Sequence, residues 1–235
     1  MSVNRLTMTA PLLCARPEAL MAAEMPTGST VIIDLGSGWT TDKARSEAQA
    51  TLEQYGALAA TLLRIRRPDD ELGQEAITRL AALRPQGFVL SGCRDAADIQ
   101  RLDVVLRVAE ARHGLEAGSI AILAEIGDSS DFFLSPTALP GVSERLWGLV
   151  FDGEALTKAT ASEAMNTAAG RIGAPLLFAR AIAVLKAKQA GLPCHEMIGG
   201  GVLGDDLHIR QQISLADGFA GVVVRTPQQL AALSG

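Results

Sequence analysis

Three acidic side chains follow two short apolar segments in the middle of the chain. Glu125 comes directly after the first segment, Ile120–Ala124, and Asp152 and Glu154 follow the second, Leu146–Phe151. Short apolar segments closed by glycine and acidic residues are typical of buried parallel strands. Carboxylates at the ends of such strands can bind a divalent cation or transfer protons. They can equally cap the next helix or lie in a solvated loop.

Eight strand-like segments run through the chain, and they alternate with segments of helical composition. The strand-like segments are Pro11–Ala15, Thr30–Leu35, Thr61–Ile65, Gly87–Leu90, Ser119–Glu125, Leu146–Asp152, Cys194–Ile198 and Gly221–Val224. This alternation has no linker and no break in composition, so it predicts one α/β domain over residues 1–235, a single (β/α)8 TIM-type barrel. A doubly wound open sheet is the alternative, but the sequence has no GxGxxG or Walker loop to support it.

The intervening segments supply the helices that such a barrel needs. Helices are predicted over Arg16–Met25, Asp42–Ala60, Glu71–Leu83, Asp95–Arg112, Ala174–Ala190, Leu207–Ala216 and Pro227–Leu233, with a short helix and a loop around Ser135–Val142. The C-terminal ends of the strands of a barrel line its active site. We therefore expect Asp34, Arg64, Glu125 and Asp152 to meet at one end.

The composition describes an ordinary soluble globular protein and excludes several classes of partner. The chain has 235 residues, 48% of them hydrophobic, and a net charge of −5. It has four lysines and no basic run, so nucleic acid and anionic membranes are not expected partners. No apolar segment approaches the roughly 20 residues of a membrane span, and the N-terminus lacks a secretion signal. The scattered cysteines, Cys14, Cys93 and Cys194, are expected to be free thiols in the cytoplasm.

Several motifs carry a family resemblance across most of the chain. They include TVIIDL, LLRIRRP, ILAEIGD, LWGLVFDGEAL and DGFAGVVVRTPQQL, in this order, between about Pro11 and Leu230. The chain resembles the citrate lyase beta subunit (citryl-CoA lyase-like) branch of the aldolase/citrate lyase superfamily. The resemblance implies a barrel that cleaves or forms a carbon–carbon bond next to a carbonyl, using a small oxo-acid or acyl-CoA thioester and a divalent metal. The chain stops just past the eighth strand-like segment, so the C-terminal extension of longer members is expected to be missing.

The resemblance also implies roles for individual residues. Arg64 matches an arginine that binds the substrate carboxylate, and a guanidinium suits this task because it donates two parallel hydrogen bonds. Asp34 matches an acidic strand position and is implied to contribute to substrate binding. Glu125 matches the glutamate that holds the metal. The implied catalytic residues are therefore Arg64 and Glu125.

Other positions depart from the family's motifs. An acidic pair that follows Asp34 in the family is replaced by Gly36 and Ser37, and the second metal-ligand position is Ala155. The family's Ile-His-Pro near the end of the barrel reads Arg225-Thr226-Pro227. The scaffold motifs are kept, and several positions that carry chemistry are changed.

A metal site would have to use the acids that remain. Mg²⁺ prefers oxygen ligands and binds through one or two carboxylates with waters and substrate oxygens. Asp152 could join Glu125, because adjacent strands lie about 4.8 Å apart. We therefore expect Mg²⁺ on Glu125 and Asp152, with Glu154 as a further candidate. In the alternative, Glu125 bonds Arg64 or a backbone amide and no metal is held.

Three functional hypotheses follow from the sequence. The leading one is a metal-dependent carbon–carbon lyase acting on a small oxo-acid or acyl-CoA thioester. The second is a non-catalytic relative that binds a carboxylate or CoA ligand, and the third is a structural subunit of a lyase assembly. The resemblance further implies a homo-oligomer, a trimer or a multiple of it. Phe178, Ile182 and Leu185 fit an interface, because they exceed what one barrel helix needs for its own core.

Overall fold

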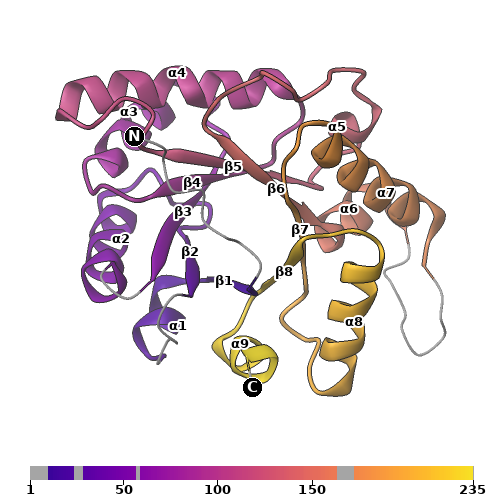
Figure 1. Cartoon of the computed structure of the whole chain (residues 1–235). Helices are drawn as coiled ribbons and strands as arrows, with labels where there is room; N and C mark the ends of the chain where they lie inside the picture. Colours follow the sequence, from indigo (N-terminus) through magenta and orange to yellow (C-terminus); the bar gives the residue numbers. More distant parts are fainter. Residues whose placement is uncertain (1–9, 24–28, 57–58, 163–171, 235) are drawn as a thin grey trace.

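The strands of this chain close into a single barrel. The computed structural model describes residues 10–23, 29–56, 59–162 and 172–234. Eight parallel strands pair in sequence order from β1 to β8, and β8 pairs with β1. Figure 1 shows the helices packed around the outside of this ring. The (β/α)8 barrel predicted from the alternating segments is therefore confirmed, and an open sheet is excluded.

The strands lie where the apolar segments predicted them. Their bounds are β1 Leu12–Ala15, β2 Thr30–Asp34, β3 Ala60–Arg66, β4 Gly87–Ser91, β5 Ala121–Ile126, β6 Leu146–Asp152, β7 Cys194–Met197 and β8 Gly221–Val224. Nearly every position in these strands is buried, because helices cover the outer face and side chains fill the inner one.

The inward-facing side chains form an apolar layer with a polar layer above it. Alternate residues of a strand point to opposite faces, so every second residue enters the barrel. The apolar interior layer consists of Leu12, Cys14, Ile32, Leu62, Val89, Leu123, Val150, Met197 and Val223. Two residues further along, the same parity turns Asp34, Arg64, Ser91, Glu125, Asp152 and Arg225 inward. The barrel is thus filled by apolar side chains below and closed by charged ones at the C-terminal end.

The helices follow the prediction with local differences. Their bounds are α1 Pro17–Met21, α2 Asp42–Tyr55, α3 Glu71–Ala81, α4 Ala96–His113, α5 Asp131–Leu134, α6 Gly153–Thr160, α7 Ala174–Gln189, α8 Asp205–Ala216 and α9 Pro227–Ser234. The short helix predicted around Ser135–Val142 lies earlier, as α5, because Ser135 is already extended. The sequence analysis missed α6, which begins where the Asp152 side chain accepts a hydrogen bond from the Ala155 amide.

None of the helices in these described ranges has both the length and the apolar character that crossing a bilayer requires.

Candidate functional site

Arg64 is the centre of a hydrogen-bonded cluster at the C-terminal end of the barrel. Its Nε donates to Glu125 Oε2 at 2.6 Å, and its Nη2 donates to Glu125 Oε1 at 2.5 Å. Nη1 donates to Asp34 Oδ1 at 3.1 Å, and Nη2 also donates to Ser91 Oγ at 2.9 Å. Four of the five guanidinium donors are therefore used by the described residues, and one on Nη1 remains. The expected meeting of Asp34, Arg64 and Glu125 is confirmed.

The strand register explains why these residues meet. Asp34 and Arg64 are direct partners in the β2–β3 pair, and Glu125 projects inward from β5 on the other side of β4. Burial alone would lower the pKa of Arg64, but the hydrogen bonds and negative charge of Glu125 more than offset this effect and raise it. Arg64 is therefore a permanent cation held in one orientation.

Gly36 explains one departure from the family's acidic motif. Its backbone has φ of +63°, a conformation that favours glycine, and the Arg16 guanidinium fills the space where a Cβ would lie. Its amide donates to Asp34 Oδ1 at 2.9 Å. The positive φ would strain an acidic residue at this position, and Asp34 is oriented here by a backbone amide instead of being followed by further acids.

A second ion pair closes the opposite side of the barrel mouth. Arg225 follows β8, and its Nη2 donates to Asp152 Oδ2 at 2.6 Å. Asp152 is the last residue of β6, and its Oδ1 accepts from the Ala155 amide at 3.0 Å, which caps α6. Asp152 therefore lies at the same end as Arg64, as expected, but its carboxylate is shared between a helix and an arginine.

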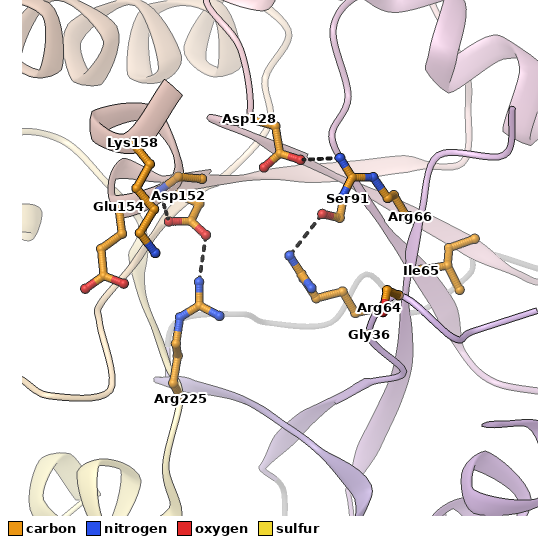
Figure 2. Close-up of a pocket in the computed structure, with 12 residues that line it drawn as sticks. Gly36, Arg64, Ile65, Arg66, Ser91, Asp128, Asp152, Glu154, Lys158 and Arg225 are labelled. Atoms are coloured by element: carbon orange, nitrogen blue, oxygen red, sulfur yellow. Dashed lines mark hydrogen bonds and ion pairs between the residues drawn. The ribbon is translucent and has the colours of Figure 1, made fainter. Parts of the chain in front are cut away.

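The two ion pairs border a cavity of about 250 Å³. Its charged lining residues are Arg64, Arg66, Asp128, Asp152, Glu154, Lys158 and Arg225. Figure 2 shows the guanidinium groups of Arg64 and Arg225 facing this space from opposite sides, with the Lys158 ammonium turned toward it. The Glu154 carboxylate points away and lies against Gly199. More cationic than anionic groups are therefore turned into the cavity.

In the ion pairs of this mouth, the cation is generally the more exposed partner. The side chain of Arg225 is 28% exposed and that of Asp152 is 6% exposed. Arg64 is 17% exposed, whereas Glu125 behind it is 1% exposed, and Arg66 is more exposed than Asp128. Asp34, as exposed as Arg64, is the exception. This arrangement offers hydrogen-bond donors to a ligand more readily than carboxylate oxygens.

The acids do not offer a preformed site for a divalent cation. Both oxygens of Glu125 accept from Arg64, and both oxygens of Asp152 accept from Arg225 or Ala155. The described ranges hold no group of three or more histidine, cysteine, aspartate or glutamate side chains able to bind a metal. The acidic residues at the mouth therefore do not fit a divalent metal ion. The Glu125–Asp152 metal site stays a prediction, and the alternative pairing of Glu125 with Arg64 is present.

Four further residues line the cavity that no sequence motif assigned to the site: Arg225, Ser91, Arg66 and Lys158. Strand parity could have identified Arg225, because it stands two residues after the inward-facing Val223. Ser91 could have been found in the same way from Val89. Lys158 lies on α6, a helix that was not predicted, so its position could not be inferred.

Comparison with solved structures shows the same fold in several proteins. RipC from Yersinia pestis is 20% identical, with a TM-score of 0.73 and coverage of 97% of this chain and 94% of that one. The Haloferax volcanii malate synthase magnesium/glyoxylate complex is 18% identical, with a TM-score of 0.76 and coverage of 96% and 75%. The citrate lyase beta subunit from M. tuberculosis, complexed with oxaloacetate and magnesium, is 18% identical, with a TM-score of 0.66 and coverage of 97% of each chain.

Comparison with curated proteins gives no match. The family comparison is specific, because the model for HpcH/HpaI aldolase/citrate lyase matches residues 12–200. These residues include every strand from β1 to β7 and all the charged residues of the mouth except Arg225. The chain therefore belongs to the HpcH/HpaI aldolase/citrate lyase family.

Proposed function

We propose that this protein is a carbon–carbon lyase or aldolase-type enzyme that acts on a small oxo-acid or acyl-CoA thioester at the barrel mouth. Family membership supports the class of reaction. The observation that carries the proposal is the position of Arg64, an inward-facing guanidinium held by Glu125, Asp34 and Ser91 at the edge of the cavity. We also propose Arg64 and Glu125 as the catalytic residues.

The cluster around Arg64 would orient the substrate. The remaining donor on Nη1 can hold one oxygen of a substrate carboxylate, and Asp34 fixes the plane of the guanidinium from the side. Glu125 acts through Arg64, because both its oxygens are occupied by that residue. Asp34 would thus contribute to substrate binding indirectly, by positioning the arginine.

Cleavage of a carbon–carbon bond next to a carbonyl leaves negative charge on the carbonyl oxygen. Fixed cations directed at this oxygen stabilise the transition state, because they need no reorganisation when the charge develops. Arg225 and Lys158 face the cavity and can take this role. A divalent metal would supply the same stabilisation, but the acids present do not fit one.

A second candidate function is ligand binding without turnover. The observation that favours it is the engagement of Glu125 and Asp152 by arginines, together with Ala155 at a position where the family has a ligand. Such a protein would bind an oxo-acid or CoA thioester and leave its bonds intact. A structural subunit of a lyase assembly would need neither ligand binding nor turnover.

A substrate screen tests the proposed function. The protein is incubated with 2-oxo acids and with hydroxyacyl-CoA thioesters, and mass spectrometry detects the cleaved products. Arg64→Lys should lower turnover by roughly 10²-fold or more, since a lysine cannot keep the bonds to Glu125, Asp34 and Ser91 and also present a fixed donor to the substrate. Arg112→Lys, at an exposed ion pair near the end of α4, is the matched control and should leave turnover unchanged. Binding without products would select the second candidate.

We further propose that the chain forms a homo-oligomer, a trimer or a multiple of it. Leu177, Phe178 and Leu185 on α7 are exposed, whereas Ile182 packs partly against the core. Exposed apolar surface of this kind often marks an interface. Light scattering should give the mass of an oligomer, and Phe178→Glu with Leu185→Glu should lower it. A monomer at micromolar concentration would contradict the proposal.

A further inference from the structure

We propose that the barrel mouth binds a small dicarboxylate between Arg64 and Arg225 without a divalent cation. This inference rests on the proposed function, because it names the substrate class of the same site. In a metal-dependent site, a bound cation supplies the positive charge that holds the ligand. In this proposal, arginine side chains of the chain itself supply it. Arg225 is the residue that supplies this charge, from a position where the family's Ile-His-Pro motif has isoleucine.

The first observation is that Arg225 already neutralises the acid a metal would need. Its Nη2 lies 2.6 Å from Asp152 Oδ2, and the other oxygen of Asp152 caps α6. A cation bound to Asp152 would lie beside the Arg225 guanidinium, so the two positive charges would repel each other and compete for one carboxylate. On the other side, Glu125 is buried and accepts two hydrogen bonds from Arg64. Two guanidinium groups therefore pair with the carboxylates that a metal cation would otherwise bind.

The second observation is that Arg225 has donors to spare. Among the described residues, one of its five N–H groups makes a hydrogen bond, the one directed at Asp152. Its buried Nε has no hydrogen-bond partner there. A guanidinium presents planar pairs of donors that match the two oxygens of a carboxylate. Arg225 can therefore bind one end of a ligand while it keeps its ion pair with Asp152.

The third observation is the placement of the two guanidinium groups across one cavity. Arg64 and Arg225 face the same space of about 250 Å³ from opposite sides of the barrel, and Lys158 is turned toward it (Figure 2). A ligand with a carboxylate at each end would contact one arginine with each. A monocarboxylate would satisfy one arginine and leave the other without an anion. The geometry thus favours a dianion over a monoanion.

Isothermal titration calorimetry with succinate tests the inference, because succinate is a stable dicarboxylate and is not cleaved. Its affinity for the wild-type protein should agree within about twofold in excess EDTA and in excess MgCl₂. Propionate, with one carboxylate, should bind at least about tenfold more weakly. Arg225→Met should weaken succinate binding by at least about tenfold, the effect of losing one charged hydrogen-bonding partner.

Two further variants and one measurement serve as controls. Arg225→Lys keeps the charge and the ion pair, so it should fold normally and show an intermediate loss of affinity. Arg112→Met removes one positive charge from an exposed pair far along α4 and should bind succinate as the wild type does. Thermal unfolding of each variant shows whether the native fold is retained.

Each outcome decides between the two levels of the proposal. Succinate binding that appears with MgCl₂ and is abolished by EDTA would overturn the inference and leave the proposed function standing. Equal affinity in Arg225→Met and the wild type would do the same. Absence of binding to succinate, oxo-acids and CoA thioesters, with and without Mg²⁺, would overturn both the inference and the proposed function.

Discussion

Arg64 and Arg145 are each bound by two carboxylates, yet they lie at opposite ends of the barrel. Arg145 directly precedes β6, at the N-terminal end. Its Nε donates to Asp103 at 2.7 Å, and its Nη1 and Nη2 donate to the two oxygens of Glu110 at 2.5 Å. Arg64 also donates two bonds to one glutamate, Glu125, but from Nε and Nη2, and it makes a further bond to Asp34. The chemistry of the two clusters is nearly identical.

The clusters differ in which partner faces solvent. Arg145, Asp103 and Glu110 are all buried to a similar degree. At the mouth, Arg64 is more exposed than Glu125, and Arg225 is more exposed than Asp152. An arginine enclosed with its acids stabilises the fold, whereas one that stands in front of its main carboxylate partner can bind a ligand. Orientation, and not the number of ion pairs, separates a structural from a functional arginine here.

The largest expected effect tests the enclosed cluster. Arg145→Met leaves the buried Glu110 without an arginine and Asp103 with Arg107 as its one arginine partner, so it should destabilise the protein by about 3–5 kcal/mol. Denaturant unfolding measures this change, and Arg112→Met should change stability by less than about 1 kcal/mol, as an exposed pair does. Succinate affinity of the folded Arg145→Met protein should equal that of the wild type. A small stability loss would mean that the cluster is not structural.

The next effect compares two buried glutamates that each accept from an arginine. Glu196 on β7 accepts from Arg180 and from Ser214, away from the cavity. Glu125→Gln and Glu196→Gln should each lower the free energy of unfolding by about 1–3 kcal/mol, because a charged hydrogen-bonding partner is lost. Glu125→Gln alone should weaken succinate binding, since it loosens Arg64. An equal loss of succinate affinity in both variants would show that the loss comes from general destabilisation of the fold and not from the Glu125–Arg64 contact.

A smaller effect tests whether the mouth can be converted into a metal site. Ala155→Asp restores the family's second ligand position and adds a carboxylate next to Asp152. With Mg²⁺ at about ten times its dissociation constant, ligand binding stabilises the variant by about 1.4 kcal/mol, or roughly 3–6 °C in melting temperature. Ala155→Asn, which lacks the charge, should show no shift, and neither should the wild type. An equal shift in the wild type would support the Glu125–Asp152 metal site that the sequence predicted.

The smallest effect is the acid sensitivity of the enclosed cluster. Burial opposes ionisation of Asp103 and Glu110, but hydrogen bonds from arginines more than offset this and lower the pKa of both groups. A carboxyl with a lowered folded pKa contributes stability above its unfolded pKa and loses it as pH falls. Stability should therefore decline in acid, by less than about 1.4 kcal/mol per pH unit for each proton taken up. Denaturant midpoints measured below pH 5 should show a shallower decline in Arg145→Met.

The fold and part of the site could be predicted from local patterns. Strand positions followed from short apolar segments, and their position at or near the C-terminal ends of these segments put Asp34, Arg64, Glu125 and Asp152 at one end, as the structure confirms. Parallel strands bring their C-terminal residues together whatever lies between them, so no long-range information was needed.

The partners of each acid could not be predicted in the same way. Arg225 and Asp152 are 73 residues apart, and their pairing depends on how β6 and β8 are placed around the ring. Arg145 pairs with Glu110 across 35 residues because α4 packs against β5, which the sequence does not specify. Helix α6 was missed because its first turn depends on the Asp152 cap rather than on a strong apolar pattern. Side-chain pairing across the barrel thus decided which acids remained free.

Asp152 joins the residue that follows β8 to the start of α6. Its Oδ2 accepts from Arg225, and its Oδ1 holds the first turn of α6 through the Ala155 amide. An anion bound by the remaining donors of Arg225 leaves this ion pair in place, so the guanidinium stays tied to the start of α6. Lys158, one turn further along α6, lines the same cavity. One carboxylate thus fixes where two of the cations around the ligand lie relative to each other.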